Sequence, residues 1–130
     1  MKLSKSTRPA VWFAPKALGN RALPPEQQLR VQIEPLSVHE LNKLRAPVIR
    51  RMTERDVSPE EMGPELRDAV ITARVQGVQG LEDDEGPVTT AVRLVAAVNA
   101  SNDAEAGEIL DEIYNAVMKA SVLREGAVGN

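Results

Sequence analysis

The sequence predicts an α+β fold that is predominantly helical, with a short N-terminal β-hairpin followed by about four helices. Three observations indicate this fold class. Apolar and polar residues alternate over residues 29–35, which is the period of a half-buried strand. A helix-capping motif starts at Ser37, directly after that strand. Over residues 106–120, apolar residues recur at the spacing of one helix face.

The composition is that of one small folded domain. The chain has 130 residues, of which 42% are hydrophobic and 27% are charged, and both values are ordinary for a globular protein. Aromatic residues make up only 2%, so aliphatic residues must build the core. We expect a flexible basic tail over residues 1–9, a single small domain over residues 10–123, and a C-terminal tail over residues 124–130.

The β-hairpin is predicted from two segments. Residues 11–13 form a short apolar run of strand-forming residues near prolines, and we expect them to pair with residues 29–35. Because a lone strand pair is marginal in water, its apolar face must pack on helices. The predicted contact joins two sets of apolar residues: Leu29, Val31 and Ile33 on the strand, and Leu41, Leu44 and Val48 on the first helix.

The first helix is predicted from a capping box. Ser37 and Glu40 have the spacing in which the serine caps the amide three residues on and the glutamate reaches back. Pro47 either kinks this helix or starts a second one. The next helix begins either at Pro59, after the cap residue Ser58, or later at Pro64.

The second half of the chain is predicted to hold two more helices. Past residue 74 the pattern blurs, because Gly77 and Gly80 weaken a helix. Residues 82–86 form an acidic turn, and a buried helix follows over residues 88–98. Thr89 or Thr90 lies near its start. The last helix has an apolar stripe of five residues: Ala106, Ile109, Ile113, Val117 and Ala120.

Several classes of catalytic and metal site are excluded by the composition. The chain has no cysteine and a single histidine, His39, so thiolate zinc sites and cysteine nucleophiles are ruled out. Common motifs for phosphate, dinucleotide, serine-hydrolase and zinc-protease sites are absent. The acidic residues 82–85 lack the spacing of a calcium loop and are interpreted as a solvated turn. We therefore expect a protein that is not an enzyme, with no catalytic residues, cofactor or metal.

Nucleic acid and membranes are not expected partners. Gly77 and Gly80 have the spacing of an RNA-binding KH loop, but acidic residues follow them. The net charge is −3, and few aromatic side chains are present to stack on bases. The longest apolar run, residues 94–98, is too short to span a bilayer, and no signal peptide is evident. We expect a cytoplasmic protein.

Three stretches support a family resemblance. Residues 29–45 (LRVQIEPLSVHELNKLR) run from a strand straight into a capped helix. Residues 75–87 (VQGVQGLEDDEGP) place a glycine-rich acidic turn ahead of a helix. Residues 109–130 (ILDEIYNAVMKASVLREGAVGN) form a closing helix and a short polar tail. In this order, from about residue 11 to the end, the chain resembles the tail assembly chaperones of long-tailed bacteriophages.

The resemblance implies a non-catalytic assembly factor that works in the host cytoplasm and is not part of the virion. Such chaperones bind the long tape measure protein and assist assembly of tail tube subunits around it, so both are expected partners. Two alternatives stay open: a structural virion component, such as a head–tail connector or tail terminator, and a small regulatory binding protein. Homo-oligomer formation is also left open.

The last helix is the predicted partner-binding element. Its apolar residues extend beyond one narrow stripe, and a helix wider than one packing face can contact both the core and a partner. We predict that Ile113 and Val117 face inward. The residues predicted to be available to the partner are Leu110, Tyr114 and Leu123.

Overall fold

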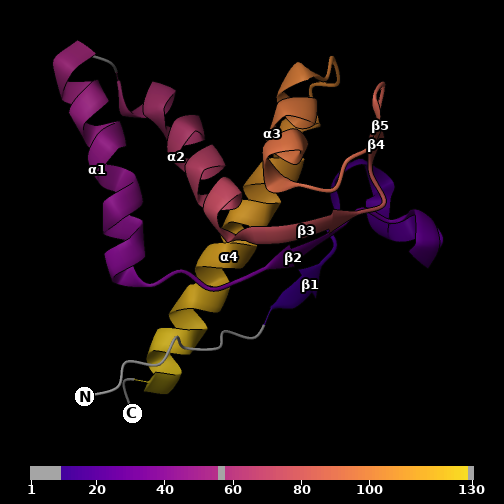
Figure 1. Ribbon diagram of the computed structural model, residues 1–130, viewed down its shortest axis with the longest axis horizontal. Helices are drawn as coiled ribbons and strands as arrows, with labels where there is room; N and C mark the ends of the chain where they lie inside the picture. Colours follow the sequence, from indigo (N-terminus) through magenta and orange to yellow (C-terminus); the bar gives the residue numbers. More distant parts are fainter. Residues whose placement is uncertain (1–9, 56–57, 129–130) are drawn as a thin grey trace.

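The computed structural model describes residues 10–55 and 58–128 and has the predicted, predominantly helical α+β fold (Figure 1). In chain order the elements are β1 (Val11–Phe13), the 3-10 helices η1 (Ala17–Ala22) and η2 (Pro25–Gln27), β2 (Arg30–Ile33), α1 (Val38–Arg55), α2 (Pro59–Arg74), β3 (Val75–Gln79), β4 (Glu82–Asp83), β5 (Gly86–Pro87), α3 (Ala91–Ala100) and α4 (Gly107–Val128). None of the helices described is long and apolar enough to cross a membrane.

The predicted strand pair is confirmed, and a third strand joins it. β1 and β2 are antiparallel, with Trp12 opposite Gln32, and β3 pairs antiparallel with the other edge of β2. β3 was missed because its two buried residues, Val75 and Val78, are three positions apart. The pairing with β2 is irregular at this point, and the extra residue Gln76 puts both valines on the buried face. A bulge of this kind hides the period of two that identifies a strand.

Gly80 ends β3 in a conformation that requires glycine. Its φ angle is +77°, and a Cβ atom there would overlap the carbonyl oxygen of Gln28. The backbone therefore passes very close to the loop before β2, which only a residue without a side chain permits.

The capping box that opens α1 is confirmed. The amide of Glu40 donates to Ser37 Oγ over 3.1 Å, and the Ser37 amide donates to Glu40 Oε1 over 3.4 Å. α1 continues through Pro47, so the alternative that a second helix starts there is wrong. α2 starts at Pro59, after Ser58, and Pro64 lies inside it. The alternative start at Pro64 is therefore also wrong.

The predicted packing of α1 on β2 is confirmed only in part. Leu41 and Leu44 pack against the core cluster that contains the three apolar residues of the strand segment, but α1 as a whole packs mainly on α2 (Figure 1). The segment between β2 and α1 turns the chain away from the sheet. The amide of Glu34 donates to the Arg74 carbonyl over 3.0 Å, and that of Leu36 donates to Ser121 Oγ over 2.7 Å. With this segment tied to the end of α2 and to α4, α1 points outward, and Val48 is buried outside the main core cluster.

The main core lies between the sheet and the helices α2, α3 and α4. Its largest fully buried side chains are aliphatic, as the composition predicts. Phe13 and Tyr114 are only partly buried and pack against this core from outside. α4 contacts α2, α3 and β2 and so runs through the middle of the fold. The fully buried hydrophobic residues are Val31, Val70, Ile71, Val88, Leu94, Leu110, Ile113 and Val117.

The acidic turn and the last two helices complete the fold. Residues 82–87 form the hairpin β4–β5, and Asp83 pairs with Arg93 of α3 over 2.9 Å. Thr90 is the cap of α3, accepting from the Arg93 amide over 3.3 Å. α4 runs to Val128, so the predicted C-terminal tail is helical over residues 124–128. The predicted basic tail, residues 1–9, lies outside the described residues.

Candidate protein-binding surface

Leu110, one of the three predicted binding residues, is fully buried and cannot contact a partner. Ile113 and Val117 are fully buried as predicted. Leu110 shares their face because it lies three residues before Ile113, one turn along the helix. The apolar stripe of α4 is wide because this helix packs on three elements of its own domain, and not because it keeps a face for a partner.

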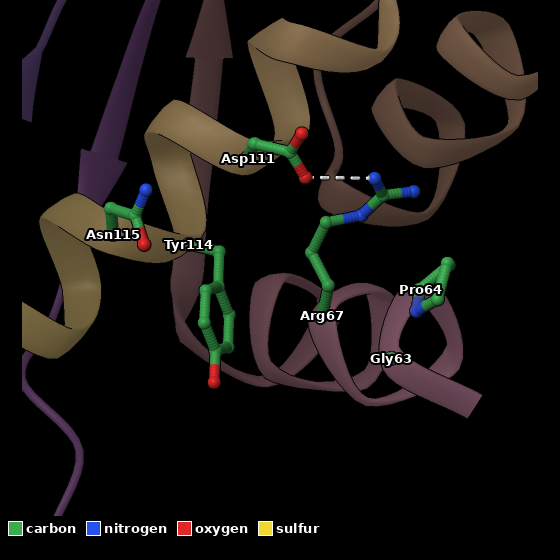
Figure 2. A pocket seen from close by; sticks show the side chains of 6 residues that line it. All are labelled: Gly63, Pro64, Arg67, Asp111, Tyr114 and Asn115. Atoms are coloured by element: carbon green, nitrogen blue, oxygen red, sulfur yellow. Dashed lines mark hydrogen bonds and ion pairs between the residues drawn. The ribbon is translucent and has the colours of Figure 1, made fainter. Parts of the chain in front are cut away.

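Tyr114, the second predicted residue, is half-buried and lines a pocket between α2 and α4 (Figure 2). The pocket has a volume of about 400 Å³. Figure 2 shows the Arg67 side chain rising from α2 to meet Asp111 of α4, with the Tyr114 ring beside it. The side chain of Leu123, the third predicted residue, lies outside the described part of the structure. The three residues therefore do not form one exposed face.

The charges in the Tyr114 pocket are already paired within the chain. Arg67 Nη1 lies 3.0 Å from an Asp111 carboxylate oxygen, and its Nε lies 3.0 Å from Asp68. Burial alone would lower the pKa of Arg67, but its hydrogen bonds to the two carboxylates outweigh burial and raise the pKa. Arg67 thus stays a cation held by two acids, and it offers a partner little unpaired charge.

A larger groove lies between β1 and α4. Its volume is about 640 Å³, and its lining is mainly apolar. On the sheet side Val11, Phe13 and Ile33 line it, and on the helix side the small residues Ala116 and Ala120 do. The remaining lining residues are Trp12, Lys16, Arg21, Glu112, Asn115 and Lys119. We call this set of residues the β1–α4 groove.

The β1–α4 groove exposes large apolar side chains on an edge strand. β1 lies at the edge of the sheet, and Val11 and Trp12 are 55% and 45% exposed there. Phe13 is half-buried, with the Arg21 guanidinium 5.9 Å from the centre of its ring. Natural edge strands usually carry features that prevent pairing with other chains, such as charged residues or coverage by another element. Val11 lies on the groove face of β1, whereas Trp12 lies on the opposite face, with its ring beside Gly77 of β3. These exposed apolar side chains make the edge a candidate contact surface.

The loop beside the β1–α4 groove is held firmly to α4. Glu112 of α4 accepts hydrogen bonds from the amides of Lys16 and Ala17, over 2.8 and 2.9 Å. Arg21 Nε donates to the Ala14 carbonyl over 2.8 Å. Because the loop is anchored in the free protein, a partner would bind a groove that is largely formed in advance.

Asn20, which is buried, fixes the same loop from within. Its Nδ2 donates to the carbonyls of Pro15 and Leu29 over 2.8 and 3.0 Å, and its Oδ1 accepts from the Leu29 amide over 2.7 Å. The side chain thus satisfies three backbone groups that this irregular loop would otherwise leave without partners.

The rim of the β1–α4 groove is positively charged although the whole chain has a net charge of −3. Lys16, Arg21 and Lys119 surround the groove, and within the described residues none of them forms an ion pair. The one carboxylate in the lining, that of Glu112, is bonded to backbone amides. A ligand in the groove would therefore meet apolar walls and unpaired positive charge.

Sequence reasoning missed this surface because it searched for a partner site on the apolar stripe of α4. One feature of the sequence did point to this surface. Trp12 is the only tryptophan of the chain and lies in a short strand-like run near prolines, although nothing in the sequence indicates that this run ends at an open edge. Ala116 and Lys119 line a groove only because the folded chain places β1 opposite them.

The acidic turn has no metal-binding geometry. Among the described residues, no three or more His, Asp or Glu side chains come together to hold a metal ion. Asp83 accepts from the Glu85 amide over 2.8 Å and pairs with Arg93, and these contacts lower its pKa. Its carboxylate thus serves to hold the β4–β5 hairpin against α3.

Comparison of this chain with protein-family models, with curated proteins and with solved structures gives no significant match.

Proposed function

We propose that this protein is a non-catalytic binding protein that holds an apolar segment of another protein. The observation that carries the proposal is the β1–α4 groove, which has apolar walls and leaves Val11 and Trp12 exposed on an edge strand. Its small and aliphatic lining residues place few shape demands on a ligand, as expected of a site that accepts varied sequences. The firmly anchored loop at its side reduces the entropy lost on binding.

We further propose that the binding partner is the tape measure protein of a long-tailed bacteriophage. The support for this partner is the resemblance of residues 29–45, 75–87 and 109–130 to tail assembly chaperones. A tape measure protein is long and prone to aggregate before the tail tube covers it, so its apolar segments need temporary protection. An open groove with apolar walls could cover such segments without requiring one particular sequence.

Co-expression with the long helical protein encoded next to this chain tests the proposal. We expect the partner to stay in the supernatant, and to co-purify, only when this protein is present. Val11→Lys should reduce co-purification about tenfold or more, because a charged side chain would replace an apolar contact in the groove. The matched control is Val92→Lys on α3, because Val92 is also an exposed valine, at 64% exposure, and lies outside the groove.

Three results would contradict this proposal or part of it. A partner that is soluble without this protein removes the chaperone role. Unchanged co-purification of the Val11→Lys variant, with a circular dichroism spectrum like that of the wild type, removes the β1–α4 groove as the binding surface. Recovery of the chain in purified mature particles favours the alternative of a structural virion component.

A further inference from the structure

We propose that the β1–α4 groove takes an extended segment of the partner, which adds to β1 as a fourth strand and carries acidic residues beside its apolar ones. This inference rests on the proposed function and names the conformation and charge of the segment that is bound. Three features of the described residues support it: the edge of β1, the small residues of α4, and the charge of the rim.

The edge of β1 offers backbone groups to an added strand. The strand order is β1-β2-β3, so β1 pairs with β2 on one side, and no described strand pairs with its other side. The N–H and C=O groups on such an edge form hydrogen bonds with any extended chain that approaches in register. A helix in the groove would leave them unused, because the backbone groups of a helix are bonded within the helix itself.

The α4 surface beyond β1 has room for the side chains of an added strand. Ala116 and Ala120 line this part of the groove and are four residues apart, which is about 6 Å along a helix. Side chains on one face of a strand recur about every 6.6 Å. Two alternate side chains of the added strand can therefore each lie over one alanine. In the view of Figure 1, β1 and α4 slope the same way, as this arrangement requires.

The charge of the rim selects the sequence of the segment. Lys16, Arg21 and Lys119 are cations without ion-pair partners among the described residues, and the carboxylate of Glu112 is bonded to backbone amides. A segment that carries glutamate or aspartate next to its apolar residues would pair with this rim. A basic segment would be repelled, so the rim discriminates between segments of equal hydrophobicity.

The inference can be tested with three synthetic peptides of equal length. The first alternates valine and threonine and has glutamates at both ends. The second has lysine in place of each glutamate, and the third repeats the first with N-methylated backbone amides, which cannot donate to a strand. Isothermal titration calorimetry with the full-length protein measures the binding of each peptide. We expect saturable binding of the first peptide, binding about tenfold weaker with the second, and none with the third.

A charge-reversing substitution in the rim distinguishes local pairing with the peptide from an effect of the protein's overall charge. Lys119→Glu should invert the preference between the acidic and the basic peptide, whereas Lys43→Glu should leave it unchanged, because Lys43 is exposed on α1 away from the groove. Both variants change the net charge of the protein equally. An equal effect of the two substitutions would overturn the role of the rim.

Other occupants of the groove would give distinct results. Equal binding of the N-methylated peptide, or tighter binding of an apolar helical peptide, would overturn the added strand. A dimer in sedimentation experiments that Val11→Lys disperses would identify a second copy of the chain as the occupant and overturn the inference. If no peptide binds, the inference fails, while the co-expression experiment still decides the proposed function.

Discussion

Asn20 and Glu112 show how much a single polar side chain can organise in this protein. Glu112 joins α4 to the start of η1 through two backbone amides, and Asn20 bonds three backbone groups of the loop that contains it. Both residues hold the segment beside the β1–α4 groove. A buried polar group with full hydrogen bonding specifies one conformation, because every alternative leaves a donor or acceptor without a partner.

Replacement of Asn20 should therefore be costly. We expect Asn20→Ala to lower the free energy of unfolding by about 2–3 kcal/mol, because it leaves buried backbone groups of Pro15 and Leu29 without their partners. The matched control is Asn42→Ala on α1, where the side chain is exposed and a change within about 0.5 kcal/mol is expected. Urea unfolding measures both, and equal losses would contradict the assigned role of Asn20.

Asp83 should make the stability of the β4–β5 hairpin depend on pH. The Glu85 amide and Arg93 lower its pKa below the ordinary value of 3.8. The ionised group thus stabilises the fold above pH 3.8, and this contribution is lost as the pH falls through the lowered pKa. Asp83→Asn should lower the Tm at neutral pH, with the difference closing in acid. Asp84→Asn, at an exposed position in the same turn, should not reproduce this behaviour.

Two helix starts that look alike in sequence differ in the structure. Ser37 caps α1 with its side chain, whereas Ser58 precedes α2 without a side-chain cap bond. We expect Ser37→Ala to destabilise the protein by about 1 kcal/mol, and Ser58→Ala to change the stability by less than about 0.5 kcal/mol. Thermal unfolding of the two variants checks this, and a larger effect at Ser58 would contradict the cap geometry.

The end of β3 and the start of α2 place glycines in opposite situations. At Gly80 an added Cβ would overlap the Gln28 carbonyl, and the φ angle is positive, so Gly80→Ala should cost about 2 kcal/mol or more. At Gly63, inside α2, an added Cβ would meet no atom of another element within 4 Å. Alanine favours helix, but the ring of Pro64 restricts a preceding residue that carries a Cβ, so Gly63→Ala should change the stability by less than about 0.5 kcal/mol. Chemical denaturation should show a large loss at Gly80 alone, and equal losses at both positions would refute the account of Gly80.

The molecule as a whole is built around α4, with the sheet on one side and α2 and α3 on others. The α1–α2 pair extends from this core and buries Val48 and Met62, which are outside the main cluster. The β1–α4 groove lies at the sheet edge formed by β1, and residues of α4 form its other wall. The fold thus creates the groove by placing α4 beside this edge.

The central position of β2 makes Val31 critical for the entire fold. Val31 is fully buried and lies between Phe13 of β1 and Val78 of β3. We expect Val31→Asp to cost about 3 kcal/mol or more, because it buries an unpaired charge in a core shared by all strands of the sheet. Circular dichroism melting should show a large fall in Tm. Val92→Asp, at an exposed valine, should melt like the wild type, and a Val31→Asp variant that does so would remove this role.

The local signals in the sequence predicted the elements well. The alternation of residues 29–35, the capping box at Ser37 and the threonine near residue 90 depend on residues at most four positions apart, and the structure confirms each of them. The aliphatic core followed in the same way from the near absence of aromatic residues. Helix and strand periods and caps arise from backbone geometry over one or two turns, so a single chain read in order reveals them.

Long-range packing determined the rest. β3 becomes a strand because it pairs with β2 through a bulge, Leu110 is buried because α4 has neighbours on three sides, and α1 leaves the sheet because Glu34 and Leu36 are bonded to distant residues. The β1–α4 groove brings together residues about 100 positions apart, such as Lys16 and Glu112. Such contacts leave no periodic pattern in the sequence, because each one joins two segments that are far apart along the chain and meet only in the folded structure.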